Sequence, residues 1–222
     1  MSPRFDAILF DLDGTLADSA GEIARALQRA LDDLGLRPAA PVSALVDGSP
    51  LEEVFAVAAP DAPPALLVRF IERYRAHYDA AAHGLTRAYP GVVDALEALR
   101  LLSPRPRLAV ATAKRSDIAR GVCVALGIAD HFDAIEGTGG TDIPPKPAPD
   151  LLLAIAGRWG VSPSRTLMVG DTTRDLAAGR AAGMRTAAVT WGLGGYDALK
   201  RAEPDHWLEE IEDLLELLGS PG

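Results

Sequence analysis

The sequence predicts an α/β fold, a parallel β-sheet covered by helices on both faces, with an all-helical region inserted after the first strand. Over most of the chain, short apolar runs alternate with longer helical patterns, whereas the stretch from about Ser19 to Ala88 is helical throughout. Strands that alternate with helices of this length form right-handed βαβ units, so the strands should be parallel. We therefore expect a core domain from residues 1–18 and 88–222 and a helical domain from residues 19–87.

The individual elements follow from the hydrophobic periodicity and from the Gly and polar residues that end each run. The expected strands are residues 7–10, 107–112, 132–135, 166–170 and 185–190. The expected helices between the strands are residues 91–102, 116–127, 150–160 and 173–184. Within the insert, the helical patterns cover residues 22–35, 51–59 and 63–78. After a turn-rich segment, residues 191–205, an amphipathic helix is expected over residues 206–218.

Composition sets limits on the class of protein. The chain has 222 residues, of which 48% are hydrophobic, enough to bury a sizeable core. A net charge of -9 argues against a nucleic-acid binder or a polybasic membrane-surface protein, since both need basic stripes. The single Cys123 excludes an intramolecular disulfide and is expected to be a buried helical thiol. No run resembles a signal peptide or a membrane span, so we expect a cytoplasmic protein.

Candidate functional residues stand directly after four of the expected strands. In open parallel sheets the ligand crevice lies at the carboxyl ends of the strands, so these residues should share one edge of the sheet. They are Asp11 and Asp13 after the first strand, Thr112 and Lys114 after the second, Lys146 in the loop after the third, and Asp171 and Asp175 after the fourth.

The acidic residues suggest a metal site. Asp11 and Asp13 are two apart, so an extended chain puts both carboxylates on the same side. Each acidic pair alone has an ordinary explanation: solvated turn carboxylates for the first, and a helix N-cap with a dipole-stabilising residue for Asp171 and Asp175. Together they would converge on one edge and need a cation, and oxygen-only ligands favour Mg²⁺ where phosphate is bound. The four histidines are scattered and do not have zinc-ligand spacing.

The lysines are unusually placed. The chain has 22 Lys and Arg residues, of which only Lys114, Lys146 and Lys200 are lysines. Lys146 lies in PPKPAPD, where prolines reduce the freedom lost in holding a side chain in place. A compact ammonium can contact a carboxylate and a phosphate oxygen together. We therefore expect Lys146 to have a binding role, whereas Lys200 has the character of an ordinary surface residue.

Together the four strand-end segments resemble the motifs of the haloacid dehalogenase superfamily. DLDGT matches its first motif, Thr112 in VATAK its second, Lys146 in KPAPD its third and GDTTRD its fourth, in the same order along nearly the whole chain. The resemblance implies a Rossmann-like core and identifies the helical insert as a small α-helical cap domain. The runs LDGTLADS, YPGVVDAL, KPAPDLLL and VGDTTRDLAAGRAAGM are most similar to the phosphoglycolate phosphatase-like branch.

The resemblance also implies roles for the site residues. Asp11 would attack phosphorus and form an aspartyl-phosphate, and Asp13 would act as general acid and then as general base. Mg²⁺ would be held by Asp11, the backbone carbonyl of Asp13 and Asp171, with Asp175 counted in the metal site as the residue that positions its neighbours. Thr112 and Lys146 would hold the transferring phosphoryl oxygens. The expected substrate contacts are Thr15, Ala113, Lys114, Gly48 and Ser49.

The expected function is Mg²⁺-dependent hydrolysis of a small phosphorylated metabolite, with 2-phosphoglycolate as the best candidate. Three alternatives stay open: a sugar-phosphate mutase, a pyrophosphatase, and a catalytically silent phospho-ligand-binding regulator. Mutase activity is disfavoured because β-phosphoglucomutase-like relatives usually have Val at the position of Thr15. Ala113 departs from the Asn that is common in this branch, and the loop Asp47 to Pro50 is either a specificity loop or a plain turn. We expect a monomer or weak homodimer.

Overall fold

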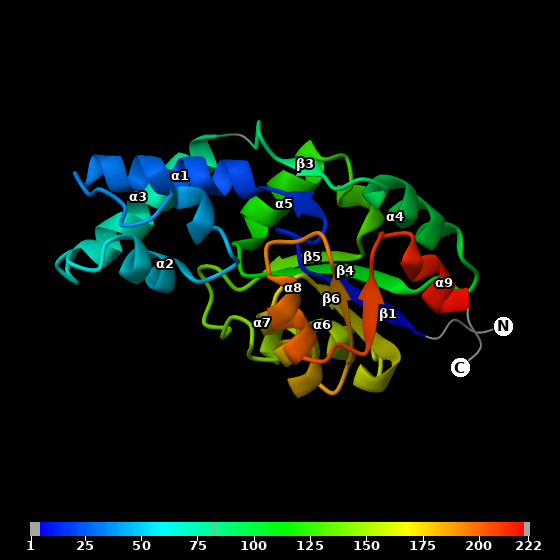
Figure 1. Ribbon diagram of the computed structural model, residues 1–222. Coiled ribbons are helices and arrows are strands. Elements are labelled where there is room, and N and C mark those ends of the chain that lie inside the picture. The colour runs from blue at the N-terminus through cyan, green and yellow to red at the C-terminus, as the bar shows by residue number, and fades with distance from the viewer. Residues whose placement is uncertain (1–4, 82, 220–222) are drawn as a thin grey trace. The chain divides into compact units, whose positions relative to one another are not determined.

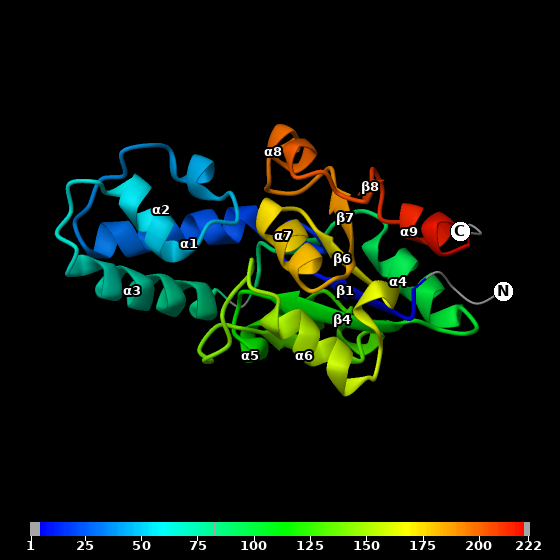
Figure 2. The ribbon, with the colours of Figure 1, turned by 90° about the horizontal axis from the view of Figure 1, so that it is seen from below.

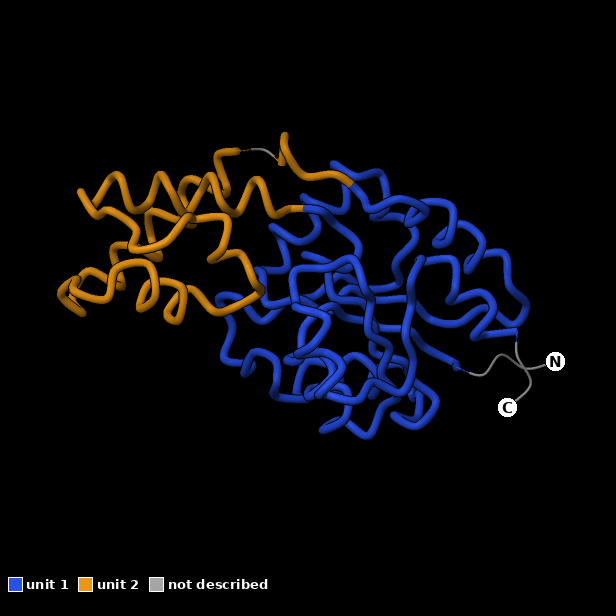
Figure 3. The backbone as a smooth tube through the Cα atoms, in the orientation of Figure 1, with its two compact units in different colours: residues 1–18, 88–222 blue, residues 19–87 orange. Residues whose placement is uncertain are grey.

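The chain divides into two compact units, which Figure 3 colours separately. Unit 1 comprises residues 1–18 and 88–222, and unit 2 comprises residues 19–87. The coordinates are those of a computed structural model that describes residues 5–81 and 83–219. The short strands β2 (Ala17–Asp18) and β3 (Arg87–Ala88) pair where the chain passes from one unit to the other.

Unit 1 is built on a six-stranded parallel sheet, in agreement with the predicted α/β class. In space the strands follow the order β5-β4-β1-β6-β7-β8, so the chain winds outward from β1 first in one direction and then in the other. The strands are β1 (Ala7–Phe10), β4 (Arg107–Thr112), β5 (Ala134–Gly137), β6 (Thr166–Gly170), β7 (Arg185–Val189) and β8 (His206–Leu208). In this doubly wound Rossmann-like arrangement, ligands bind beside the first strand, where the winding direction reverses.

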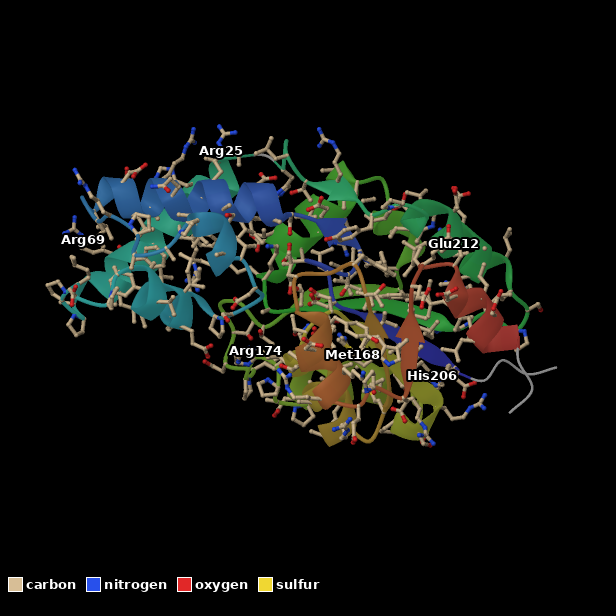
Figure 4. The ribbon with its side chains drawn as sticks, viewed as in Figure 1. Arg25, Arg69, Met168, Arg174, His206 and Glu212 are labelled. Atoms are coloured by element: carbon tan, nitrogen blue, oxygen red, sulfur yellow. The ribbon has the colours of Figure 1, made fainter. Side chains whose placement is uncertain are left out.

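Helices cover both faces of this sheet (Figure 1). On one face lie α4 (Val92–Leu101), α5 (Ser116–Ala125) and α9 (Asp213–Gly219), and on the other α6 (Asp150–Arg158), α7 (Thr173–Ala181) and α8 (Tyr196–Arg201). Alternate residues of β1 serve the two layers: Ile8 and Phe10 pack in the first core cluster, and Leu9 in the second. Met168, labelled in Figure 4, packs with Leu9 in that second cluster. Because the central strand β1 is buried on both faces, its sequence AILF is apolar throughout and does not alternate.

In the described residues of unit 2, the regular elements are helices joined by loops, apart from the last residue, Arg87, which lies in β3. Its elements are α1 (Ala20–Asp33), the short 3-10 helix η1 (Val42–Leu45), α2 (Leu51–Ala58) and α3 (Leu66–Ala80), in turquoise and blue in Figure 2. The predicted helices of the insert agree with α1, α2 and α3 apart from their ends. Leu27 and Leu31 occupy one face of α1 and pack in a core of the unit's own, which also contains the ring pair Phe55 and Phe70 with centroids 5.1 Å apart. A separate core is what allows this unit to be a compact body in its own right.

The C-terminal region differs from the prediction. Residues 206–218 were expected to form one helix, but His206–Leu208 form strand β8, which pairs in parallel with β7, and α9 begins only at Asp213. Only the second half of this segment forms the helix that its hydrophobic pattern predicts. Its first three residues complete the sheet, so a long-range pairing determines their conformation. The preceding turn-rich segment also contains a short helix, α8, that was not predicted.

Two further 3-10 helices, η2 (Ala129–His131) and η3 (Pro163–Arg165), precede β5 and β6. Across residues 5–81 and 83–219, none of the helices combines the length and the apolar character that a membrane span requires.

Candidate active site

The carboxyl ends of β1 and β6 bring two aspartates to the same edge of the sheet. Asp11 directly follows β1 and Asp171 directly follows β6. The two strands are neighbours, with Phe10 in register with Val169. The backbone N–H of Asp11 continues this pairing by donating to the carbonyl of Val169 at 2.9 Å. Both carboxylates are therefore placed by the most regular part of the fold.

A third carboxylate joins them from the first turn of α7. Asp11, Asp171 and Asp175 each offer one oxygen, and these oxygens lie within 4.8 Å of one another. All three residues are buried. A set of carboxylate oxygens with no nitrogen or sulfur donor suits a hard divalent cation, so the donor chemistry of this cluster fits Mg²⁺.

Lys146 lies within this acidic cluster. Its Nζ donates to Oδ1 of Asp11 at 2.5 Å and to Oδ1 of Asp175 at 2.5 Å, and its side chain is only 7% exposed. Burial disfavours the ammonium form, but the two carboxylates more than offset this, so the pKa of Lys146 lies above its usual value. The lysine therefore stays charged and orients the carboxylate of Asp11.

One ammonium does not neutralise three carboxylates. Burial raises the pKa of Asp11 to about 7; the charges of Asp175 and Asp13 add to this effect, and Lys146 opposes it. Burial likewise raises the pKa of Asp171 well above its usual value, reinforced by the charges of Asp175 and Asp11. Like charges this close and this buried are unfavourable unless a further positive charge is supplied. The electrostatics of the cluster thus favour a bound cation.

Asp171 is held by Thr15, which was expected to contact the substrate, and by the loop after β7, which was not expected in the site. Thr15 Oγ1 donates to Oδ1 of Asp171 at 3.1 Å, and the Leu193 N–H donates to Oδ2 at 2.8 Å. A Cβ on Gly192 would lie 2.1 Å from Asp171 Cβ, and one on Gly194 would lie 2.0 Å from the Asp171 carbonyl oxygen. The loop after β7 therefore closes around Asp171. Three glycines within the five residues WGLGG, at a strand end, were the available signal.

The carboxylate of Asp175 accepts hydrogen bonds from Thr172 and Lys146. Its Oδ2 accepts from the backbone N–H of Thr172 at 3.0 Å and from the Thr172 hydroxyl at 2.6 Å, which forms a capping box at the start of α7. Its Oδ1 accepts from Lys146. Asp175 was expected in the metal site as a residue that positions its neighbours, and these contacts describe a carboxylate that positions Lys146.

Asp13 and Lys114 form a second ion pair. Lys114 Nζ lies 2.8 Å from Oδ2 of Asp13, and the two side chains are 13% and 17% exposed. Lys114 was expected among the substrate-binding residues, so its contact with Asp13 is a relation that the sequence did not predict. The Asp13 side chain is less buried than those of Asp11, Asp171 and Asp175, and its cationic partner is Lys114, not Lys146.

Thr112 is the last residue of β4, next to β1 in the sheet, and Ala113 follows it. Thr112 is buried, and its Oγ1 accepts the backbone N–H of Lys114 at 3.3 Å, whereas Ala113 is exposed. Gly48 and Ser49 lie in unit 2, in a turn where the Ser49 N–H donates to Oδ1 of Asp47 at 2.9 Å and Gly48 has a φ of 78°. Their contact with substrate stays a prediction.

Comparisons with known proteins agree with this geometry. The sequence pattern of a family described as haloacid dehalogenase-like hydrolase matches residues 8–189. A phosphoglycolate phosphatase from Aquifex aeolicus is 36% identical over 216 residues, which cover 95% of each chain. The pyrophosphatase PpaX from Bacillus velezensis is 33% identical over 97% of each chain. A solved structure of a haloacid dehalogenase-like hydrolase from Streptococcus pneumoniae superposes with a TM-score of 0.84 at 29% identity, over 96% of this chain and 98% of that one.

Proposed function

The chain belongs to the haloacid dehalogenase-like hydrolase family, and on this premise we propose that it is a Mg²⁺-dependent phosphomonoester hydrolase that acts through an aspartyl-phosphate on Asp11. The observation that carries the proposal is the buried contact of 2.5 Å between Lys146 Nζ and Asp11 Oδ1, beside a cluster of further carboxylates. A purely structural aspartate would not need a buried ammonium and two acidic neighbours. A nucleophile that must meet a phosphate dianion does need that positive charge.

In the proposed first step, a carboxylate oxygen of Asp11 forms a bond to phosphorus while the bond from phosphorus to the ester oxygen breaks. Lys146 fixes the orientation of the Asp11 carboxylate and offers its remaining donor to a phosphoryl oxygen. Thr112, at the end of the adjacent strand, would hold another phosphoryl oxygen. Phosphoryl transfer depends chiefly on positioning and charge neutralisation, and these residues supply both.

Asp13 would move the protons. It would give a proton to the leaving ester oxygen in the first step and accept one from the attacking water in the second. Its position two residues after Asp11 gives both carboxylates access to the same edge of the sheet.

Mg²⁺ would be held by Asp11, Asp171 and the backbone carbonyl of Asp13, and when bound it would neutralise charge on the phosphoryl group. Asp175 would act on this site indirectly, through its contact with Lys146. Thr15 and the loop around Leu193 would keep the Asp171 carboxylate oriented.

For the substrate we propose a small phosphorylated metabolite, with 2-phosphoglycolate as the first candidate, supported by the 36% identity to the Aquifex aeolicus enzyme. Unit 2 would be the cap domain that selects it, with Gly48 and Ser49 among its substrate contacts. Pyrophosphate is the second candidate, because the PpaX relative is named a pyrophosphatase and matches the chain over nearly its full length.

The fully buried Cys123, with no partner for a disulfide in this sequence, is compatible with the cytoplasmic location that we propose.

The test is phosphate release by the purified protein, with and without Mg²⁺, against a panel that includes 2-phosphoglycolate, pyrophosphate and several sugar phosphates. Asp11→Asn serves as the control because it keeps the shape of the side chain and removes the nucleophile. We expect release that requires both Mg²⁺ and Asp11, with 2-phosphoglycolate ranked first. A folded protein that releases no phosphate from any member of the panel would contradict the proposal, and a preference for pyrophosphate would favour the second candidate.

A further inference from the structure

Lys114 is the cation that the structure places against Asp13, with Nζ 2.8 Å from Oδ2. We propose that Lys114 is a positioning residue for this carboxylate: it holds Asp13 in the orientation from which the proton reaches the leaving group. This inference rests on the proposed phosphatase function and adds a residue to it. The two lysines of the site would then serve different carboxylates, Lys146 the nucleophile Asp11 and Lys114 the general acid.

The main chain of Lys114 is held firmly at the end of β4. Its N–H donates to Thr112 Oγ1 at 3.3 Å, and its carbonyl accepts from the Gly139 N–H at 3.1 Å. Gly137, the last residue of β5, lies so close that a Cβ there would be 1.9 Å from the carbonyl oxygen of Lys114. A side chain that starts from a fixed backbone has a defined reach, which is what a positioning role needs.

Asp13 has reason to need such a partner. It is followed by Gly14, whose φ is 85°, so the chain turns away from the strand direction directly after it. Its carboxylate lies beyond the end of the strand and is partly exposed, at 17%, so the sheet alone does not fix its orientation. A 2.8 Å contact with a well-anchored ammonium that is itself only 13% exposed limits this rotation.

The proton chemistry provides a specific way to detect this role. In the first step the Asp11 oxygen bonds to phosphorus, the ester bond breaks, and its electron pair goes to the leaving oxygen, which takes the proton of Asp13. An alkoxide needs that proton, whereas p-nitrophenolate is stable enough to leave without it. The value of kcat/KM reports substrate binding and this first transfer but not the later hydrolysis of the aspartyl-phosphate. It therefore reflects the step in which Asp13 is the acid and leaves out the step in which Asp13 is the base.

The experiment compares kcat/KM of the full chain, with Mg²⁺, for p-nitrophenyl phosphate and for an alkyl phosphate without a carboxylate, such as glycerol phosphate. Lys114→Met should lower the value for the alkyl ester at least about tenfold more than the value for the aryl ester, since general acid catalysis contributes about 10²- to 10⁴-fold. Asp13→Asn should show the same selectivity, and the double variant should lose little more than Asp13→Asn alone. Lys114→Arg should recover part of the loss.

Two further variants separate this role from general damage. Gly137→Ala keeps the lysine but displaces its backbone, so the same selective loss is expected even if Lys114→Met folds poorly. Arg115→Met removes the next positive charge, whose partner is the surface residue Asp117, and should affect both esters equally.

Equal losses on the two esters for Lys114→Met would overturn the inference. A rise in KM for 2-phosphoglycolate, measured alongside, with no such rise for glycerol phosphate would also overturn it, because Lys114 would then be binding the substrate carboxylate directly. The proposed function fails separately, and visibly, if the wild-type chain releases no phosphate or releases it independently of Asp11.

Discussion

Replacing Lys146 by Met should destabilise the protein and make its stability depend on Mg²⁺. The ammonium donates to Asp11 and Asp175 at 2.5 Å each and is 7% exposed, so its removal leaves a buried acidic cluster without its cation. Two carboxylate oxygens within 4.8 Å of each other repel by at least about 3.5 kcal/mol at an effective dielectric constant of about 20. Breaking a buried ion pair from one side typically costs about 3–5 kcal/mol, and we expect a loss in that range.

The assay is urea unfolding at about pH 8, where Asp11 of the wild-type protein, with a pKa of about 7, is mostly ionised. Lys146 lowers this pKa, so in the variant the pKa of Asp11 lies higher than in the wild-type protein. A divalent cation can replace the missing charge, so Mg²⁺ at about 100 times its dissociation constant should return about 2.7 kcal/mol to the variant. Lys200→Met is the matched control: it removes an exposed lysine from α8 and should change stability by less than about 0.5 kcal/mol.

The reasoning would be refuted if Lys146→Met unfolded within about 1 kcal/mol of the wild-type protein in the absence of Mg²⁺. It would also be refuted if Mg²⁺ stabilised the Lys200 control but not the Lys146 variant, since the acidic cluster would then not be the cation site.

Two other predictions concern the loop around Asp171 and the stability in acid. Gly192→Ala places a Cβ 2.1 Å from Asp171 Cβ, so the rate of phosphate release should fall at least about tenfold. Gly195→Ala, with open space around its Cβ, is the control, and its rate in the same assay should stay within about threefold of the wild-type rate. Partial burial raises the pKa of Asp133, but hydrogen bonds from the Leu108 N–H and from two arginines lower it by more than that. The folded-state pKa of Asp133 therefore lies below the unfolded value. The contribution of the Asp133 carboxylate to the free energy of unfolding is therefore complete above about pH 4 and is lost as the pH falls through the folded-state pKa. Asp133→Asn should lower the free energy of unfolding by about 1–3 kcal/mol near pH 7. Unfolding measured at several pH values should show this difference from the wild-type protein disappear in acid.

The strands that carry the site could be predicted because they are buried on both faces. AILF, LAVA within RLAVAT and LMV within TLMVG are continuous apolar runs, and each is followed within two residues by a polar residue, so the sequence marks both the strand and the start of the crevice. That placement was enough to expect Asp11, Lys146, Asp171 and Asp175 at one edge, where the structure brings the three carboxylates within 4.8 Å of one another and Lys146 into contact with two of them.

What could not be predicted depends on long-range contacts. Strand β8 consists of three residues that pair with β7, and its local sequence continues into a helical pattern. The contact of Leu193 with Asp171 uses a backbone N–H, which no side-chain identity reveals. The pairing of Lys114 with Asp13 joins residues from two adjacent strand ends, and the sequence shows only that both carry charge.

The central claim is that Asp11 becomes phosphorylated, and direct detection of that intermediate tests it best. Asp13→Asn should slow the hydrolysis step, because the variant lacks the general base, and so allow the intermediate to accumulate. After the variant is mixed with Mg²⁺ and p-nitrophenyl phosphate, whose leaving group departs without the Asp13 proton, and quenched in acid, mass spectrometry should find one phosphoryl group on the peptide that contains Asp11. No such adduct with Asp13→Asn, in a preparation whose wild-type counterpart hydrolyses the same substrate, or an adduct that persists in the Asp11→Asn, Asp13→Asn double variant, would contradict the account.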